Sequence, residues 1–149
     1  MPLKRIPNVL SPNLLHVLAS MGHGDEIVLA DANFPSSSVS KSGPIEVRAD
    51  GIDIPTLMDA ILQLFPLDAY VDRPIALMDL VPSDKQRGLQ TPVWEKYKAI
   101  SYKHEGKQVD VQLVERFAFY ERAKKAFAVV HTGETALYGN IILKKGVIG

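Results

Sequence analysis

The chain has 149 residues, no cysteine, and 17 basic side chains against 17 acidic ones. The absence of cysteine excludes disulfides, thiolate nucleophiles and Cys-ligated metal sites, and the zero formal charge gives no global electrostatic reason to bind nucleic acid or an anionic membrane. No apolar run approaches the ~20 residues of a membrane span, and the first residues lack the features of a signal peptide. We therefore expect one domain over residues 1–149, in a cytoplasmic protein.

The predicted elements alternate between helices and strands. In the first helix, Ser11 is placed to cap the amino end, Pro12 fits the first helical position, and Gly22 fits the exit. Helices are predicted over residues 11–22, 54–65, 91–106 and 116–126. Strands are predicted over residues 26–31, 45–50, 75–81, 109–115, 127–134 and 138–146, with polar loops over 31–44 and 82–90. The alternation predicts an α/β fold with helices on both faces of a mostly parallel or mixed sheet of about six strands.

The stretch "MGHGDEIVLADANFP" (residues 21–35) contains the strongest candidate for chemistry, His23. Its neighbours Gly22 and Gly24 carry no Cβ, so the backbone can reach φ > 0 and a ligand can approach closely. An imidazole can both donate and accept a proton near neutral pH. The structural alternative is that Gly22 caps the preceding helix and His23 is an ordinary loop residue. We expect Asp25 to hydrogen-bond the backbone amides of this turn.

Asp31 and the helix that begins at Arg116 provide further candidates. Asp31 ends a predicted strand, where it could hold sugar hydroxyls or orient an imidazole; the alternative is a turn former. Arg116 and Tyr120 are four residues apart and share one helix face. A guanidinium grips hydroxyls or carboxylates with a fork of donors, and a phenol can donate a hydrogen bond or stack on a sugar face. The alternative is an ordinary amphipathic helix.

The segment "YGN" combines a phenol, a glycine and an amide at the start of the last predicted strand. Tyr138 and Asn140 offer polar groups, and Gly139 permits a close backbone approach; an amide supplies both a donor and an acceptor for a sugar hydroxyl. The alternative is a simple turn into the strand. His131 ends another predicted strand and could reach the same region.

Several motifs of cofactor and metal chemistry are absent from the sequence. There is no G-x-G-x-x-G, no Walker loop, no H-E-x-x-H and no G-x-S-x-G. The histidine and acid positions of residues 21–35 match no recognised metal-ligand spacing. We therefore expect neither a cofactor nor a metal.

Several of these stretches occur together and in order in one known family. The stretches "LSPNLLHVLASMGHGDEI", "RFAFYERAKKAFAVVHTGE" and "YGNIILKKG" resemble the L-fucose mutarotase branch of the RbsD/FucU family, almost from end to end. The ribose pyranase branch reads "GHTD" and "YANI" where this chain has "GHGD" (22–25) and "YGNI" (138–141). The resemblance implies a three-layer α/β/α fold, a monosaccharide substrate, no cofactor, and a homo-oligomer, most often a decamer, with sites near subunit interfaces.

The resemblance also assigns roles residue by residue. His23, in the GHGD motif, corresponds to the proton donor of the family. The positions that correspond to sugar-binding residues are Asp31, Arg116, Tyr138, Gly139 and Asn140, with Tyr120 a further candidate from the same helix as Arg116. The implied activity is the interconversion of the α and β anomers of L-fucose by acid/base-assisted ring opening and closure. The alternatives are a ribose pyranase-type isomerase and a monosaccharide-binding protein without turnover.

Overall fold

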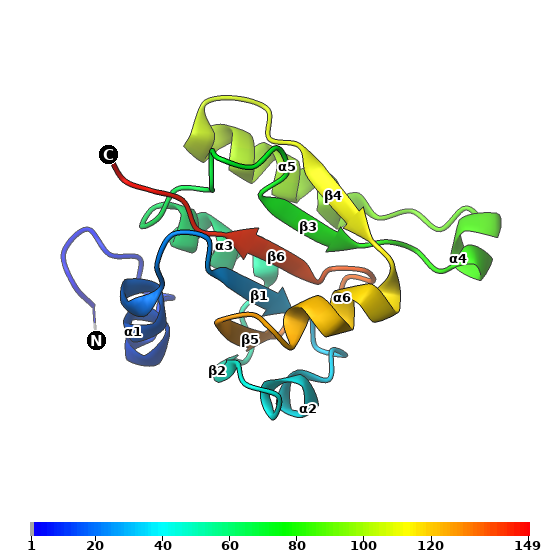
Figure 1. Cartoon of the computed structure of the whole chain (residues 1–149), viewed down its shortest axis with the longest axis horizontal. Coiled ribbons are helices and arrows are strands. Elements are labelled where there is room, and N and C mark those ends of the chain that lie inside the picture. The colour runs from blue at the N-terminus through cyan, green and yellow to red at the C-terminus, as the bar shows by residue number, and fades with distance from the viewer. Residues whose placement is uncertain (1) are drawn as a thin grey trace.

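The computed structural model describes residues 2–149 and contains a single mixed β-sheet with helices on both faces (Figure 1). The helices are α1 (Pro12–Ser20), α2 (Ser36–Ser40), α3 (Ile54–Leu62), α4 (Pro82–Gln86), α5 (Pro92–Glu105) and α6 (Arg116–Ala123). The strands are β1 (Glu26–Ala30), β2 (Ile45–Ala49), β3 (Ile75–Met78), β4 (Val111–Val114), β5 (Ala128–Thr132) and β6 (Ile141–Lys144). The expected α/β class and sheet size are confirmed.

The sheet has the strand order β2-β5-β1-β6-β3-β4. Strand β5 pairs in parallel with both β2 and β1, and β3 pairs in parallel with β4. Strand β6 runs antiparallel between β1 and β3 and joins the two parallel groups. The carboxyl ends of the five parallel strands therefore share one edge of the sheet, and β6 begins at that same edge.

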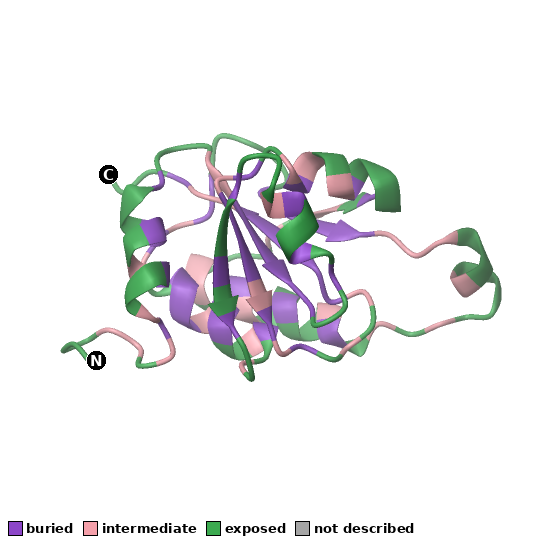
Figure 2. Ribbon diagram, turned by 90° about the horizontal axis from the view of Figure 1, so that it is seen from below, coloured by how far each residue is buried: buried purple, intermediate pink, exposed green. Residues whose placement is uncertain are grey.

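Alternate residues of the strands enter two separate cores, as the period of two in a strand requires. On one face, Ile27 and Leu29 of β1 pack in a cluster with α1, α3 and α5. On the other face, Val28 and Ala30 pack in a second cluster with α2 and α6. The central strands β1, β3, β5 and β6 are accordingly buried between two helical layers (Figure 2), which confirms the three-layer arrangement.

The start of α1 is as the sequence predicts, but its end is not. The Leu14 backbone N–H donates to Ser11 Oγ at 3.2 Å, and Pro12 occupies the first turn. The helix ends at Ser20, two residues earlier than expected, because the backbone of the next residue, Met21, is extended. Gly22 therefore needs no left-handed conformation, whereas Gly24 does, with φ of 86°.

Two short helices lie in segments predicted as polar loops. Helix α2 contains one apolar residue, Val39, which is buried against the sheet, and α4 has no buried residue. Neither segment has the apolar periodicity from which a helix is recognised. The last strand also begins later than predicted, because Tyr138 has a left-handed backbone with φ of 58° that extended pairing does not tolerate. No helix within residues 2–149 is long and apolar enough to cross a membrane.

The central position of β6 gives a prediction about stability. Ile142 is fully buried in the core beneath α6, so Ile142→Ala should lower the free energy of unfolding by about 2–5 kcal/mol. The matched control is Ile45→Ala on the edge strand β2, where the side chain is 46% exposed and the loss should be small. Urea denaturation of both variants measures the difference, and equal losses would contradict this description of the core.

Candidate functional site

A cavity of about 410 Å³ opens at the sheet edge where the parallel strands end. It lies between the loop after β1, the start of α6, the segment before β6 and the α4 region. Five of the predicted site residues line it: Asp31, Arg116, Tyr120, Tyr138 and Asn140. Residues more than 100 positions apart in sequence are thus brought to one place by the order of the strands.

Asp31 lies at the inner end of this cavity and is 6% exposed. Its Oδ1 accepts a hydrogen bond from the Asn33 backbone N–H at 3.0 Å, which is the turn-forming role that the sequence also allowed. Burial raises the pKa of the Asp31 carboxyl above its ordinary value, although the backbone N–H groups of Asn33 and Phe34 and the nearby His131 act in the opposite direction. Asp31 is therefore both a structural residue and an acid with perturbed protonation in a cavity, as functional acids often are.

Asn140 is held beside Asp31 by a buried hydrogen bond. Its Oδ1 accepts from the Asp31 backbone N–H at 2.7 Å, and the residue is 5% exposed. No acceptor for Asn140 Nδ2 is found in the described part of the chain, so this amide group remains available to donate to a ligand in the cavity.

The segment before Asn140 is fixed from α5. Trp94 Nε1 donates to the Tyr138 carbonyl at 2.8 Å, and the Tyr97 hydroxyl donates to the Gly139 carbonyl at 2.6 Å. A Cβ on Gly139 would lie 3.1 Å from the Ala136 carbonyl oxygen. Gly139 does not line the cavity, and its glycine identity is explained by this close packing.

The Tyr138 side chain connects the cavity to α4. Its hydroxyl donates to Asp84 Oδ2 at 2.5 Å and accepts from the Val81 backbone N–H at 3.2 Å. This hydrogen bond from Tyr138 lowers the pKa of Asp84. Burial and the Asp84 carboxylate together raise the pKa of Tyr138. The phenol is consequently a neutral group that holds the α4 segment over the cavity.

Arg116 and Tyr120 form the opposite wall from successive turns of α6. The helix begins there because Glu115 Oε2 accepts from the Ala118 backbone N–H at 2.9 Å. Arg116 Nε donates to the Tyr120 hydroxyl at 3.3 Å, and the guanidinium carbon lies 5.7 Å from the centre of the Tyr120 ring. Within residues 2–149 its two terminal nitrogens have no acceptor, so the exposed fork can bind a ligand.

His23 is not brought to this cavity. It precedes β1 and Asp31 follows it, so the two lie beyond opposite ends of a five-residue strand that is about 16 Å long. The turn that carries His23 lies at the left end of β1 in Figure 1, whereas the carboxyl ends of β1, β3 and β4 lie to the right. As predicted, Asp25 supports the turn: its Oδ2 accepts from the Gly22 backbone N–H at 2.7 Å. The His23 ring instead pairs with Asp68, with 3.0 Å between Nε2 and Oδ1.

His131 also lies outside the cavity. Its Nδ1 is 2.7 Å from the hydroxyl of the buried Ser36, and it lines a smaller hollow beside α2 together with Arg48. Its contact with Ser36 gives it a structural role next to the cavity. Phe34 lines both hollows, and His131 is close enough to Asp31 to lower the pKa of that carboxyl.

Sequence reasoning missed about half of the cavity lining. The additional residues are Asn33, Phe34, Met78, Val81, Asp84, Arg87 and Leu137. Asn33 and Phe34 could have been inferred because they directly follow Asp31. Asp84 and Arg87 belong to a segment predicted as a solvated loop, and no local pattern marks it.

The arrangement suits a small, neutral molecule rich in hydroxyl groups. An acid, an amide and a guanidinium can bind several hydroxyls, while Phe34, Met78 and Leu137 provide apolar surface. Among the described residues, no group of three or more His, Cys, Asp or Glu side chains is arranged to hold a metal ion.

Comparison with known proteins points to one family. The profile of the RbsD / FucU transport protein family matches residues 4–148. The chain is 66% identical to the fucose mutarotase of Mus musculus over 146 residues, which cover 98% of this chain and 95% of that protein. It is similar to the crystal structure of the fucose mutarotase from Streptococcus pneumoniae in complex with L-fucose, with a TM-score of 0.88, 49% identity, and coverage of 99% of this chain and 100% of the other. It shares only the fold with Bacillus subtilis RbsD complexed with D-ribose. That structure is 20% identical, with a TM-score of 0.71, and the match covers 99% of this chain and 100% of the other.

The buried carboxyl of Asp31 gives a prediction about stability and pH. Because its pKa is raised in the folded state, the folded chain holds this proton more tightly than the unfolded chain does. Stability is therefore lost as the pH rises from the ordinary carboxyl value of 3.8 through the raised value, and the loss persists above it. Asp31→Asn retains an oxygen for the Asn33 N–H but cannot ionise, so at pH 7 it should be at least as stable as the parent.

Urea denaturation of Asp31→Asn between pH 4 and pH 8 measures this effect. The advantage of the variant should grow with pH over the interval in which Asp31 ionises. Asp110→Asn, at an exposed acid, is the control and should show no such trend. If the difference in stability between Asp31→Asn and the parent fell between pH 4 and pH 7, the assignment would be contradicted.

Proposed function

Because this chain belongs to the RbsD / FucU transport protein family, we propose that it is a fucose mutarotase, an isomerase that interconverts the α and β anomers of L-fucose. The observation that carries the proposal is the cavity at the carboxyl edge, where Asp31, Arg116 and Asn140 converge from three separate elements. We place this activity in the cytoplasm, as the sequence predicts.

The reaction requires proton transfers and no redox step. A base takes the proton of the hydroxyl on C1 while an acid protonates the ring oxygen. The bond between C1 and the ring oxygen breaks, and an open-chain aldehyde with a free hydroxyl results. Rotation about the bond between C1 and C2, followed by the reverse transfers, closes the ring on the other face of C1. Groups that both donate and accept protons near neutral pH serve this cycle, and we assign that part to His23.

The cavity lining favours a deoxyhexose over a pentose. L-fucose carries a methyl group on C5, which D-ribose lacks, and Phe34, Met78 and Leu137 offer apolar surface for it. Asp31 and Asn140 are placed to bind hydroxyls at the inner end of the cavity, and Arg116 and Tyr120 at its wall. In this proposal these residues hold the ring in one orientation and so contribute by positioning.

His23 and the cavity lie at opposite edges of one subunit, so we propose that the site is completed by a second copy of the chain. His23 of one subunit enters the cavity of its neighbour, in a homo-oligomer that we take to be a decamer. Exposed apolar side chains beside His23 support a covered surface: the Tyr70 ring centre is 5.1 Å from that of His23, and Tyr70 is 78% exposed and its neighbour Val71 37%.

The catalytic assignment predicts the behaviour of His23→Ala. Saturation-transfer NMR on an equilibrated L-fucose solution should show anomer exchange slowed about 10²–10⁴-fold, the usual contribution of an acid–base group. His16→Ala, at an exposed histidine on α1, is the control and should exchange at the parent rate. Wild-type exchange in a folded His23→Ala variant would refute the assignment.

The same measurement on other sugars separates the alternatives. We expect faster exchange for L-fucose than for D-ribose, D-galactose or D-glucose. Faster turnover of D-ribose would favour a pyranase, and binding without exchange would favour a monosaccharide-binding protein.

A composite site predicts complementation between two variants that each impair a different part of the site. His23→Ala subunits retain an intact cavity, and Asp31→Asn subunits retain an intact imidazole. If each site takes these residues from two different copies, random mixing of subunits in equal amounts should restore about one quarter of the sites. The mixture must be dissociated and reassembled before exchange is measured, and assembly is followed by light scattering. Reassembled mixed oligomers with no activity would show that both residues serve within one subunit.

A further inference from the structure

Tyr70, in the segment between α3 and β3, projects into solvent. It is 78% exposed, the highest value among the large apolar side chains of residues 2–149. A tyrosine ring has an apolar face that gains free energy when another group covers it. Single exposed apolar side chains are nevertheless common on protein surfaces. The exposure of Tyr70 therefore matters only because of the residue beside it.

The Tyr70 ring lies against the ring of His23. The two ring centres are 5.1 Å apart and the ring planes are inclined by 51°, within the range of a packed aromatic pair. The main chain of Tyr70 is fixed, because its N–H donates at 3.0 Å to the carboxylate of Asp68, which is 4% exposed. The His23 side chain is itself 46% exposed. The two rings thus form one projecting unit on an anchored base.

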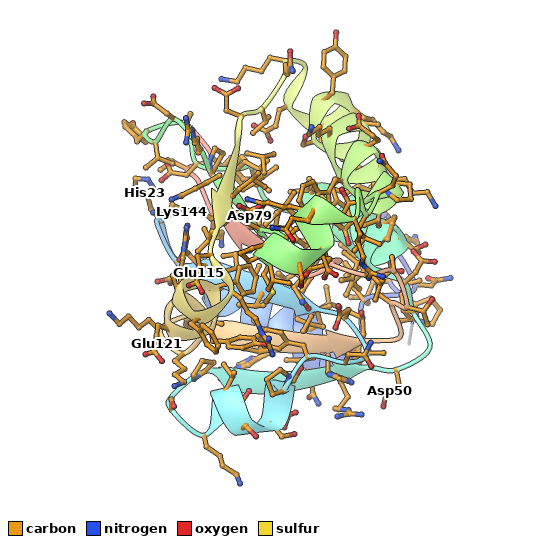
Figure 3. All side chains as sticks on the ribbon, turned by 90° about the vertical axis from the view of Figure 1, so that its right-hand side faces the viewer. His23, Asp50, Asp79, Glu115, Glu121 and Lys144 are labelled. Carbon is orange, nitrogen blue, oxygen red and sulfur yellow. The ribbon has the colours of Figure 1, made fainter. Side chains whose placement is uncertain are left out.

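This unit lies on the side of the chain from which His23 meets a neighbour in the proposed assembly. His23 and Lys144 lie at the same rim of the molecule, away from Asp50 (Figure 3). If His23 enters the cavity of another subunit, a ring 5.1 Å away must enter with it. That separation is comparable with the width of a pyranose ring and its substituents. While the imidazole reaches C1 and the ring oxygen, the Tyr70 ring can therefore cover the neighbouring carbons.

The cavity has surfaces that suit such a guest. Its inner end carries the polar groups of Asp31 and Asn140, which are placed to bind hydroxyls. Leu137 also lines the cavity but is 53% exposed, so it offers apolar surface at the mouth. In the pyranose form of L-fucose, the hydrogens on C3, C4 and C5 share one face of the ring. A sugar held from the inner end by its hydroxyls can turn this apolar face toward an aromatic ring that enters at the mouth.

We propose that Tyr70 is a sugar-binding residue of the neighbouring subunit's cavity, where its ring packs on the apolar face of the pyranose beside C1. This inference rests on the proposed function and on its composite site. Tyr70 transfers no proton in this role. It covers the sugar while His23 of the same subunit exchanges protons, so its contribution is to binding.

Substitutions at Tyr70 separate sugar binding from simple packing between subunits. Tyr70→Ala should raise the KM for L-fucose about 3–10-fold, the usual worth of an aromatic contact, and should change the saturated exchange rate less than twofold. Tyr70→Phe keeps the ring and should behave like the parent. Tyr70→Leu keeps apolar bulk but has no aromatic face, so its KM should rise as in Tyr70→Ala. Tyr102→Ala, at a tyrosine of α5 that is 59% exposed, is the control and should leave the KM unchanged.

Mixed oligomers test which subunit's cavity Tyr70 serves. In the first mixture, Asp31→Asn/Tyr70→Ala subunits are reassembled with His23→Ala subunits. The restored sites then combine an intact cavity with an imidazole that has lost its neighbouring ring, and their KM should be raised. In the second mixture, Asp31→Asn subunits are reassembled with His23→Ala/Tyr70→Ala subunits. Their restored sites receive both rings from one intact unit, and their KM should equal that of the parent.

The outcomes distinguish failure of this inference from failure of the proposed function. A parent-like KM in assembled Tyr70→Ala or Tyr70→Leu, with assembly followed by light scattering, would overturn the role of Tyr70. The reverse order of KM values in the two mixtures would show that Tyr70 serves its own subunit and would overturn it as well. Normal exchange in His23→Ala would instead overturn the catalytic assignment on which the proposed function depends.

Discussion

The buried hydrogen bond from the Asp31 backbone to the Asn140 side chain is the contact on which the candidate site depends. Asn140 reaches this position because β6 runs against the direction of its neighbours and therefore begins where β1 ends. If β6 were parallel, Asn140 would lie at the far edge of the sheet. Loss of the Asn140 acceptor would leave a buried N–H without a partner, at a cost of about 1–3 kcal/mol. The same contact thus links the end of β1 to the start of β6 and holds two sugar-binding candidates side by side.

Strand β6 also organises the opposite edge. Its last residue, Lys144, and the following Lys145 hold Asp68 and the turn that carries His23. Gly146 follows, where a Cβ would lie 2.6 Å from the Leu67 carbonyl oxygen, so only glycine fits against this segment. The segment from residue 138 to residue 146 therefore supports the cavity at one end and the imidazole at the other.

Much of this fold could be predicted from local pattern, and the site only in part. The alternation of helices and strands, the Ser11 cap and the role of Asp25 all follow from residues close in sequence. The strand order and the direction of β6 depend on packing between distant segments, which no local pattern contains. Helix α4 was missed for a related reason: it has no buried residue and is held through the contact between Asp84 and Tyr138.

The stretch at residues 21–35 illustrates the limit most clearly. Its histidine and its acid are eight residues apart in a continuous motif, which suggests one site, yet an intervening strand carries them to opposite edges. Their surroundings differ accordingly, since Asp31 is desolvated and His23 is half exposed. In the proposed assembly, the imidazole would leave water only when a neighbour's cavity covers it, and its electrostatic interactions with the sugar would then strengthen. Assembly would therefore not merely stabilise the subunits but would create the environment in which His23 exchanges protons.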